Sequence, residues 1–425
     1  MHKIVLFGAG KSSGSLINYL AKESRALSWS FKVADAHPAA STIEILIKNE
    51  IPIIKLDVQD AQARTELIKD ADIIISLLPP GLHQIIAQDC LEMGKNLLTA
   101  SYVDEPLRKM DGALKSKGIL FLCEMGLDPG IDHMSAMQLI DRIKKEGGRI
   151  SEFKSHTGGL VAPENDNNPW HYKISWNPRN VVRAGAAGAV FKQSNVIRKL
   201  SYKEVFDNCV GVNVPGLGNL AYYPNRDSLS YMKLYGVEEA KTFLRSTLRY
   251  PVFCKNWKWI VAAGLTDDQK IIKDKKIRFS EWSEPILPFV KEDNRQMFSF
   301  LGFFDDSPIP GTVNTNADLL QYLLESRLAM QPHDKDMIVM LHELDIEKET
   351  TTEFVRSSLL VTGEDSVKTA MAKTVGLPIG IAAKLILEKK IRLTGLHIPI
   401  IPEIYEPVLD ELTKHGIRFH EEIIH

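Results

Sequence analysis

The first twenty residues, "MHKIVLFGAGKSSGSLINYL" (1–20), join a short apolar run to a glycine-rich turn and then to an amphipathic segment. This order is typical of a strand, a tight turn and a helix. The turn reads GAGKSSG, so a serine holds the third position of a GxGxxG pattern and a glycine follows it. Between a strand and a helix, such a turn predicts a site where a dinucleotide pyrophosphate meets helix N-terminal amides. The candidate contacts are Gly8, Gly10, Lys11, Ser12 and Ser13.

The same alternation of apolar runs and helix-period segments continues to about residue 125. Continuous β-branched runs joined by helical crossovers indicate a parallel sheet that is covered on both faces. We therefore predict an α/β fold with an N-terminal doubly wound, Rossmann-like domain. After the first strand at 3–8, the remaining strands are expected at 30–35, 51–57, 72–79, 96–102 and 119–125.

Asp35 ends the second predicted strand, 25 residues after Gly10. An acidic side chain there can accept hydrogen bonds from the adenosine ribose diol and repels a 2'-phosphate, which favours NAD over the alternative, NADP. The competing interpretation is a solvated turn aspartate before "HPAA". The carboxyl edge of the same sheet adds Asp57, Leu77, Leu78 and Pro79 as cofactor contacts, and His83 and His133 are predicted to cap or pack.

Composition excludes several classes of function. The 425 residues carry a net charge of -2 with no basic block, so the footprint of a nucleic-acid binder is absent. No apolar run approaches the roughly 20 residues of a membrane helix. The four cysteines, Cys90, Cys123, Cys209 and Cys254, show no metal-ligand spacing. We expect a cytoplasmic protein with reduced thiols, no metal and a small-molecule ligand.

The pattern changes after residue 126. A helix is expected at 132–148 and a strand at 150–159, followed by a polar loop whose Trp170, Tyr172 and Trp176 favour an ordered binding loop over a linker. Residues 229–330 are predicted to be mainly helical, including "VEEAKTFLRSTLRY" (237–250). A strand at 336–346, a helix at 366–388 interrupted near Gly376 and Pro378, and a final helix and strand complete the expectation.

Five motifs carry a resemblance to a known family: "TASYVDE" (99–105), "MGLDPGIDHM" (125–134), "TGGLVAPENDNNPWHYKISW" (157–176), "YPNRDS" (223–228) and "TLRY" (247–250). Together they resemble saccharopine dehydrogenase of the glutamate-forming type, from end to end of the chain. The resemblance implies a dinucleotide-binding domain at 1–126 plus about 390–425. It further implies a mixed α/β substrate and dimerisation domain at 127–228 and about 331–389, with a helical insert at about 229–330.

The implied reaction is the reversible oxidation of saccharopine to an imine, which is hydrolysed to L-glutamate and aminoadipate semialdehyde. The substrate is an amino acid with several carboxylates and a secondary amine. The resemblance also implies a homodimer. Known fungal members prefer NADP, whereas Asp35 argues for NAD.

Substrate contacts follow from the same motifs. Arg226 is a candidate carboxylate clamp, because guanidinium forms two parallel charge-assisted bonds, although a surface ion pair with Asp227 is the alternative. Tyr250 is a contact or a packing residue, and Trp176 a pocket wall or core. Thr157 stands where the family often has Cys. The resemblance also implies Ser101, Tyr102, Asn225 and Thr247 as substrate contacts, and Ala100, Leu127 and Pro129 as cofactor contacts.

Asp128 lies just past the sixth predicted strand, before a Pro-Gly turn. Its carboxylate can hold the substrate amine or exchange a proton with it, and the resemblance favours contact over proton transfer. The alternative is an Asx turn in which Asp128 bonds its own backbone.

Two other functions share this scaffold. One is a reductase that acts on a related carbonyl-amine adduct such as carboxyspermidine. The other is a dinucleotide-binding sensor without turnover, which would have little need for a carboxylate clamp.

Overall fold

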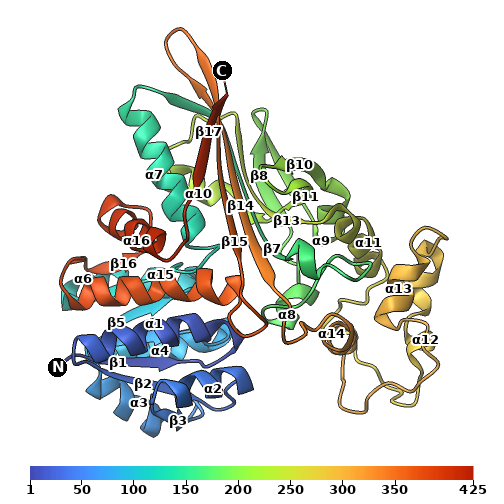
Figure 1. Ribbon diagram of the computed structural model, residues 1–425, viewed down its shortest axis with the longest axis horizontal. Helices are drawn as coiled ribbons and strands as arrows, with labels where there is room; N and C mark the ends of the chain where they lie inside the picture. The colour runs from blue at the N-terminus through green and yellow to red at the C-terminus, as the bar shows by residue number, and fades with distance from the viewer. Residues whose placement is uncertain (425) are drawn as a thin grey trace. The chain divides into compact units, whose positions relative to one another are not determined.

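The computed structural model describes residues 1–424, which divide into two compact units. The first unit contains Met1–Glu146 and Val367–Phe419. The second contains Gly147–Ser366 and the residues from His420 onward. Each unit has its own sheet, as the ribbon in Figure 1 shows.

A seven-stranded parallel sheet organises the first unit, in the order β16-β6-β5-β4-β1-β2-β3. The doubly wound sheet predicted from the sequence is thus confirmed. Strand β2 has the predicted bounds, and the other predicted strands are shorter than expected, because pairing stops where the chain leaves the sheet. The strands are β1 (Lys3–Phe7), β2 (Ser30–Asp35), β3 (Ile53–Lys55), β4 (Ile73–Ser76), β5 (Asn96–Thr99), β6 (Leu120–Leu122) and β16 (Gly395–His397).

Helices connect and cover these strands. A short 3-10 turn, η1 (Lys11–Ser13), precedes α1. The helices are α1 (Gly14–Ala26), α2 (Ala40–Lys48), α3 (Ala61–Asp70), α4 (Pro80–Met93), α5 (Glu105–Lys109), α6 (Asp111–Lys117), α7 (Ile131–Lys145), α15 (Ala370–Leu387) and α16 (Pro402–Lys414).

Helix α15 is the long apolar helix of the first unit. By length and composition it could cross a membrane, contrary to the expectation that no apolar run approaches that length, but 83% of its residues are buried. It runs beside α1 (Figure 1), and a Cβ at Gly376 would lie 2.8 Å from the Leu16 nitrogen. The predicted interruption is absent from α15, which continues through Gly376 and Pro378. Burial against α1 stabilises the helix despite the hydrogen bond that proline removes.

A ten-stranded mixed sheet organises the second unit. Its main path is β10-β11-β13-β7-β14-β15-β17, and β8, β9 and β12 branch from it. The central strand β7 runs parallel to β13 and antiparallel to β14. The strands are β7 (Arg149–Val161), β8 (Ala189–Gln193), β9 (Val196–Leu200), β10 (Val210–Val214), β11 (Gly218–Pro224), β12 (Arg226–Asp227), β13 (Thr242–Arg249), β14 (Asp336–Glu347), β15 (Thr352–Thr362) and β17 (His420–Ile424).

The helix predicted over 237–250 is wrong, because residues 242–249 form β13. Its apolar residues recur at helical spacing, yet the segment pairs with β11 and β7 on its two sides, and this pairing overrides the local pattern. Helices dominate only from residue 251. The helices of this unit are α8 (Pro178–Val182), α9 (Tyr202–Val205), α10 (Leu229–Leu234), α11 (Pro251–Ala262), α12 (Phe279–Trp282), α13 (Arg295–Leu301) and α14 (Asn316–Arg327).

The division of the chain also differs from the expected domains. Helix α7 belongs to the first unit, where it packs on α16, and α15 belongs there through its contact with α1. Strand β17 instead joins the second unit, because it pairs with β15. Tertiary partners, rather than composition, decide these boundaries.

Candidate active site

The glycine turn lies between β1 and α1, as predicted. Gly8 has a φ of +110°, and a Cβ there would lie 2.8 Å from the carbonyl carbon and oxygen of Leu77. Only glycine fits both the backbone conformation and this close approach. Gly14, one residue past the expected third position, packs against the Ile45 side chain. The Ser13 hydroxyl turns inward and donates to the Gly10 carbonyl oxygen at 2.7 Å.

This turn fits a dinucleotide pyrophosphate. A Cβ at Gly10 would meet nothing within 4 Å, so the backbone offers open space directly before the η1 turn and α1. Helix α1 has 13 residues, and its N-terminal amides are a site for negative charge. Lys11 is exposed and Ser12 half-buried at this end of the helix, and their contact with phosphate stays a prediction.

Asp35 ties this turn to the end of β2. Its Oδ2 accepts a hydrogen bond from the Ala9 amide and its Oδ1 from the His37 amide, both at 2.6 Å. The carboxylate is therefore fixed beside the glycine turn, where an adenosine ribose would lie in such a fold. Each oxygen keeps a second lone pair for a ribose hydroxyl.

The other predicted cofactor contacts fall into two groups at the carboxyl edge of the sheet. Leu77 adjoins the glycine turn, with Leu78 and Pro79 following it toward α4. Around Gly126, the loops after β5 and β6 pack together, since a Cβ there would lie 3.1 Å from the Ala100 Cβ and 3.1 Å from the Pro129 carbonyl oxygen. Leu127 is buried in the same loop. Asp57 is exposed, and its Oδ1 accepts from the Gln59 amide at 2.9 Å.

Ser101 lies two residues past β5 and contacts a histidine that we had expected only to cap or pack. Its hydroxyl is 2.6 Å from His83 Nε2, and His83 Nδ1 is 2.8 Å from the hydroxyl of Ser76, the last residue of β4. Burial lowers the pKa of His83 to about 4, although Asp104 acts in the opposite direction. One sequence feature could have identified His83 as a site residue: it lies in the first turn of the helix that follows a strand of the parallel sheet.

Asp128 and Tyr102 meet at the same edge. The Tyr102 hydroxyl donates to Asp128 Oδ1 at 3.1 Å, and the Asp128 side chain is half-buried. Asp132 binds backbone in the same loop, accepting from the Gly130 amide at 2.7 Å. The contact with Tyr102 places a hydroxyl donor on Asp128 Oδ1, and contact of Asp128 with a substrate stays a prediction.

A buried pair, Glu124 and His133, stabilises the loop that carries Asp128. Glu124 Oε1 accepts from the Val103 amide at 3.0 Å, and Glu124 Oε2 is 2.8 Å from His133 Nε2. Both side chains are almost completely buried. His133 therefore packs, as predicted, and the pair joins the loops that carry Tyr102 and Asp128.

The second unit gathers its own set of predicted contacts on β7 and β13. Thr157 and Thr247 are register partners on these strands, although they are 90 residues apart in sequence. Within residues 1–424, the buried Thr157 hydroxyl has no hydrogen-bond partner. Two residues beyond Thr247, Arg249 is only 4% exposed.

Arg249 has an unusual environment for a buried cation. One Nη donates to the Leu248 carbonyl oxygen at 2.8 Å, while Nε has no partner within the described chain. The guanidinium carbon lies 5.3 Å from the Tyr172 ring centre and 5.6 Å from that of Phe253. Among residues 1–424 no carboxylate pairs with this guanidinium, so its charge is not neutralised and the site suits an anionic ligand.

The aromatic loop is ordered, as its composition predicted. Trp176 Nε1 donates to the Tyr172 hydroxyl at 3.1 Å, and Trp176 is half-buried against the helical core. His171 Nδ1 lies 2.5 Å from Asp166, and its ring centre is 5.5 Å from that of Tyr250. Burial and Asp166 raise the pKa of Tyr250. The loop thus surrounds Tyr250 and Arg249 with polar and aromatic groups.

Arg226 and Asn225 follow β11. Arg226 is exposed, and its φ of +55° is uncommon for a residue with a side chain. The Asn225 backbone amide donates to the Arg245 carbonyl oxygen at 3.0 Å. Asp227 accepts from the Leu229 amide at 2.8 Å, just before the Ser228 N-cap of α10.

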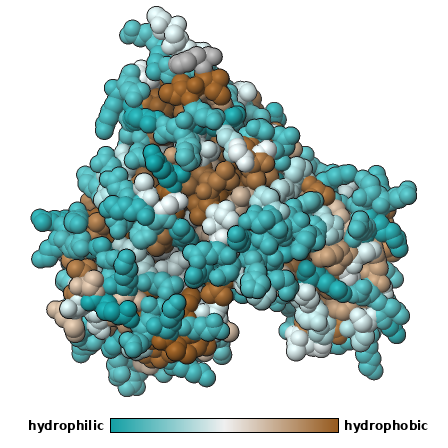
Figure 2. Space-filling view, viewed as in Figure 1, coloured by the Kyte–Doolittle hydropathy of each residue, from teal (hydrophilic) through white to brown (hydrophobic). Residues whose placement is uncertain are grey.

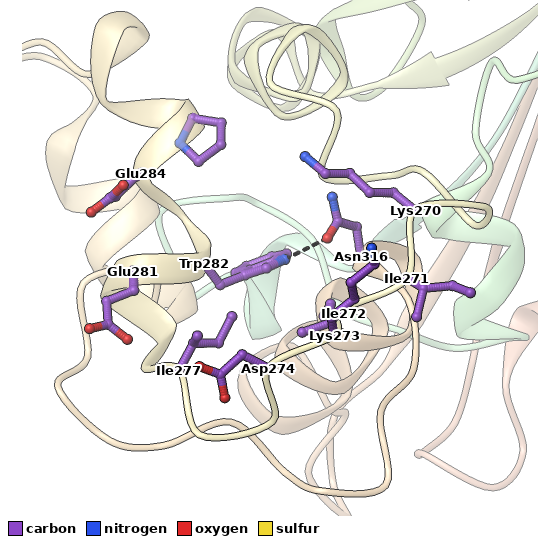
Figure 3. Close-up of a pocket in the computed structure, with 11 residues that line it drawn as sticks. Lys270, Ile271, Ile272, Lys273, Asp274, Ile277, Glu281, Trp282, Glu284 and Asn316 are labelled. Carbon is purple, nitrogen blue, oxygen red and sulfur yellow. Dashed lines mark hydrogen bonds between the residues drawn. The ribbon is translucent and has the colours of Figure 1, made fainter.

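A separate cavity of about 530 Å³ lies in the helical part of the second unit (Figure 3). Lys270, Lys273, Asp274 and Glu281 line it, and Trp282 Nε1 donates to Asn316 Oδ1 at 3.0 Å. None of the predicted substrate or cofactor residues lines this cavity, so it is not the candidate active site.

Known proteins resemble this chain in sequence and in structure. The saccharopine dehydrogenase NADP binding domain matches residues 4–122, and the saccharopine dehydrogenase C-terminal domain matches residues 126–417. An α-aminoadipic semialdehyde synthase of Arabidopsis thaliana is 35% identical over 421 residues, which are 90% of this chain but 39% of that protein. The chain thus spans less than half the length of this relative.

Two fungal proteins are matched over their whole length or nearly so. The NADP(+), L-glutamate-forming saccharopine dehydrogenase of Schizosaccharomyces pombe is 31% identical, with 100% of this chain and 99% of that protein covered. The apo structure of saccharopine dehydrogenase (L-Glu forming) from Saccharomyces cerevisiae has a TM-score of 0.89 and 31% identity, covering 100% of both chains. The chain therefore belongs to the saccharopine dehydrogenase family.

Proposed function

We propose that the chain catalyses the reversible, NAD(P)-dependent oxidation of saccharopine to L-glutamate and aminoadipate semialdehyde. The observation that carries the proposal is the buried Arg249, which has aromatic neighbours and, within residues 1–424, no partner for its Nε. The hydroxyl of Thr157, the register partner of Thr247 on the adjoining strand, also has no partner among these residues. These groups suit a carboxylate, and saccharopine has several. The family membership and the names of its fungal relatives point to the same substrate.

The residues can be given roles in this reaction. When bound, the dinucleotide supplies the hydride acceptor, and Gly8, Gly10 and the N-terminus of α1 would hold its pyrophosphate. Arg249 and Arg226 bind substrate carboxylates through paired N–H donors. Asp128 holds the substrate amine through its carboxylate oxygens, with Tyr102 orienting Oδ1. Oxidation removes a hydride from carbon and a proton from nitrogen, and water then hydrolyses the imine.

The test is to incubate the purified chain with saccharopine and either NAD or NADP. We expect nicotinamide reduction and one glutamate for each reduced nicotinamide. Reduction without glutamate would point to a different secondary amine. If neither cofactor is reduced, the substrate assignment is refuted.

The coenzyme preference is a separate proposal. The matched domain and the fungal relatives are named for NADP, which supports NADP as a cofactor. We propose that NAD is preferred here, because the fixed carboxylate of Asp35 repels a 2'-phosphate. Asp35→Ala should lower the ratio of kcat/KM for NAD to that for NADP by about tenfold or more. A wild-type preference for NADP would overturn the proposal.

We also propose a homodimer in a reducing, cytoplasmic compartment. Strand β17 is the edge of the ten-stranded sheet, and its Ile423 and Ile424 are 55% and 48% exposed. Figure 2 shows an apolar patch near this end of the chain on a mostly hydrophilic surface. Light scattering should give twice the mass of the chain, and a monomer at micromolar concentration would refute the dimer.

The proposed compartment rests on the cysteines. Within residues 1–424 the four cysteines form no disulfide, which is compatible with a reducing compartment.

A further inference from the structure

His83 joins two serine hydroxyls at the carboxyl edge of the first sheet. It is the fourth residue of α4 and is only 6% exposed. Its Nδ1 faces the hydroxyl of Ser76 at 2.8 Å and its Nε2 the hydroxyl of Ser101 at 2.6 Å. Both ring nitrogens are therefore engaged, and each hydroxyl must donate to the ring or accept from it.

The ring between these hydroxyls is neutral near pH 7, because burial lowers the pKa of His83 to about 4. A neutral imidazole has one N–H donor and one acceptor nitrogen. Two tautomers are possible. With the proton on Nε2, Ser101 accepts from the ring and Ser76 donates to Nδ1. With the proton on Nδ1, the two serines exchange these roles.

Burial of Ser76 selects between the tautomers. Its side chain is 0% exposed, and within residues 1–424 His83 is the one hydrogen-bond partner of its hydroxyl. If Nδ1 carried the proton, the buried Ser76 O–H would have no acceptor, which is a costly arrangement. If Nε2 carries the proton, the Ser76 O–H is satisfied. Ser101 is only half-buried, so its own O–H can turn toward a ligand.

We propose that His83 is a positioning residue: it holds the Nε2–H tautomer and thereby makes Ser101 a hydrogen-bond donor to a carboxylate of the substrate. The proposal rests on the proposed function, since Ser101 is a substrate contact that the family resemblance implies. Ser76 is the anchor that fixes the tautomer. The arrangement favours an anionic group at Ser101 and disfavours an ammonium group there, which needs an acceptor.

The tautomer can be tested without any enzyme assay. Nitrogen NMR of the full chain labelled at histidine should show one ring with a protonated Nε2 and an unprotonated Nδ1, and the signal should disappear in His83→Gln. Ser76→Ala should change the Nδ1 shift of that ring. A protonated Nδ1 on His83 would overturn the proposal whether or not saccharopine is the substrate.

Kinetics test the effect on the substrate. His83→Ala and Ser101→Ala should each raise KM for saccharopine about tenfold, the value of one hydrogen bond to a charged group, with little change in kcat. The double variant should be no worse than Ser101→Ala alone, because both changes remove one interaction. His83→Gln, whose amide N–H can reach Ser101, should recover most of the loss, whereas His83→Asn should not.

Cys90→Ala is the matched control, since Cys90 is buried in the same helix and should leave KM unchanged. Additive effects of His83→Ala and Ser101→Ala, or equal KM values for the Ala and Gln variants, would show that His83 is only structural. If the wild-type chain oxidises no saccharopine, the proposed function fails, and the NMR experiment still decides the tautomer.

Discussion

Arg249→Met should separate the binding role of this arginine from its contribution to stability. The side chain is 4% exposed, one Nη donates to the Leu248 carbonyl oxygen, and two aromatic rings lie 5.3 and 5.6 Å from the guanidinium carbon. Methionine would fill similar space without a charge.

The magnitude follows from these contacts. Losing the charged hydrogen bond costs about 1.5–3 kcal/mol, and each cation–π contact about 1–2 kcal/mol. Against this, the folded protein no longer carries a desolvated cation with an unsatisfied Nε, a penalty of several kcal/mol. The two sides nearly cancel, so we expect the free energy of unfolding to change by less than about 2 kcal/mol.

Arg249→Met should affect substrate binding much more strongly than it affects stability. Two charge-assisted bonds to a carboxylate contribute about 3–6 kcal/mol together, so KM for saccharopine should rise at least about 100-fold. The assay combines steady-state kinetics with thermal denaturation of the chain in the absence of ligand. Arg249→Lys keeps the charge but loses the paired geometry, and its KM should lie between those of wild type and Arg249→Met.

Lys173→Met provides a matched contrast, because Lys173 is equally buried but lies 2.6 Å from Asp334. Its removal leaves an uncompensated carboxylate and should cost about 3–5 kcal/mol of stability. If Arg249→Met destabilised the chain as much as Lys173→Met and left KM unchanged, Arg249 would be a structural residue and the reasoning would be refuted.

Three further predictions concern the first unit. Gly8→Ala should reduce dinucleotide affinity at least tenfold by calorimetry, because its Cβ would lie 2.8 Å from the Leu77 carbonyl; unchanged affinity would remove this turn from the site. Gly376→Val should lower the denaturation midpoint by several degrees through its clash with Leu16, and an unchanged midpoint would contradict the tight contact of α1 and α15. The folded-state pKa of His83, about 4, lies below its ordinary 6.5, so its contribution to stability is complete above pH 6.5 and is lost as pH falls toward 4. This loss amounts to about 3 kcal/mol, and His83→Gln should show a weaker acid dependence of the denaturation midpoint than wild type; equal dependence would refute the assignment.

The glycine turn and the parallel strands could be predicted because their signals are local. A strand that is buried on both faces reads as a continuous apolar run, and the turn that follows it needs glycine where the backbone approaches Leu77. It could therefore be predicted that the residues at the carboxyl ends of these strands lie together at one edge of the sheet. What the sequence did not reveal is the bridge that His83 makes between Ser76 and Ser101, because it depends on which strands are neighbours.

By itself, the sequence determined the doubly wound domain, the positions of its loops and the motifs that identify the family, since each of these depends on residues close together in the chain. Only the tertiary structure decided that 242–249 is a strand, because its two neighbouring strands satisfy its backbone and override helical spacing. The same pairing brings Thr157 beside Thr247 and buries Arg249 among aromatic rings. Burial and pairing are properties of segments that meet across long sequence separations, and no local pattern encodes them.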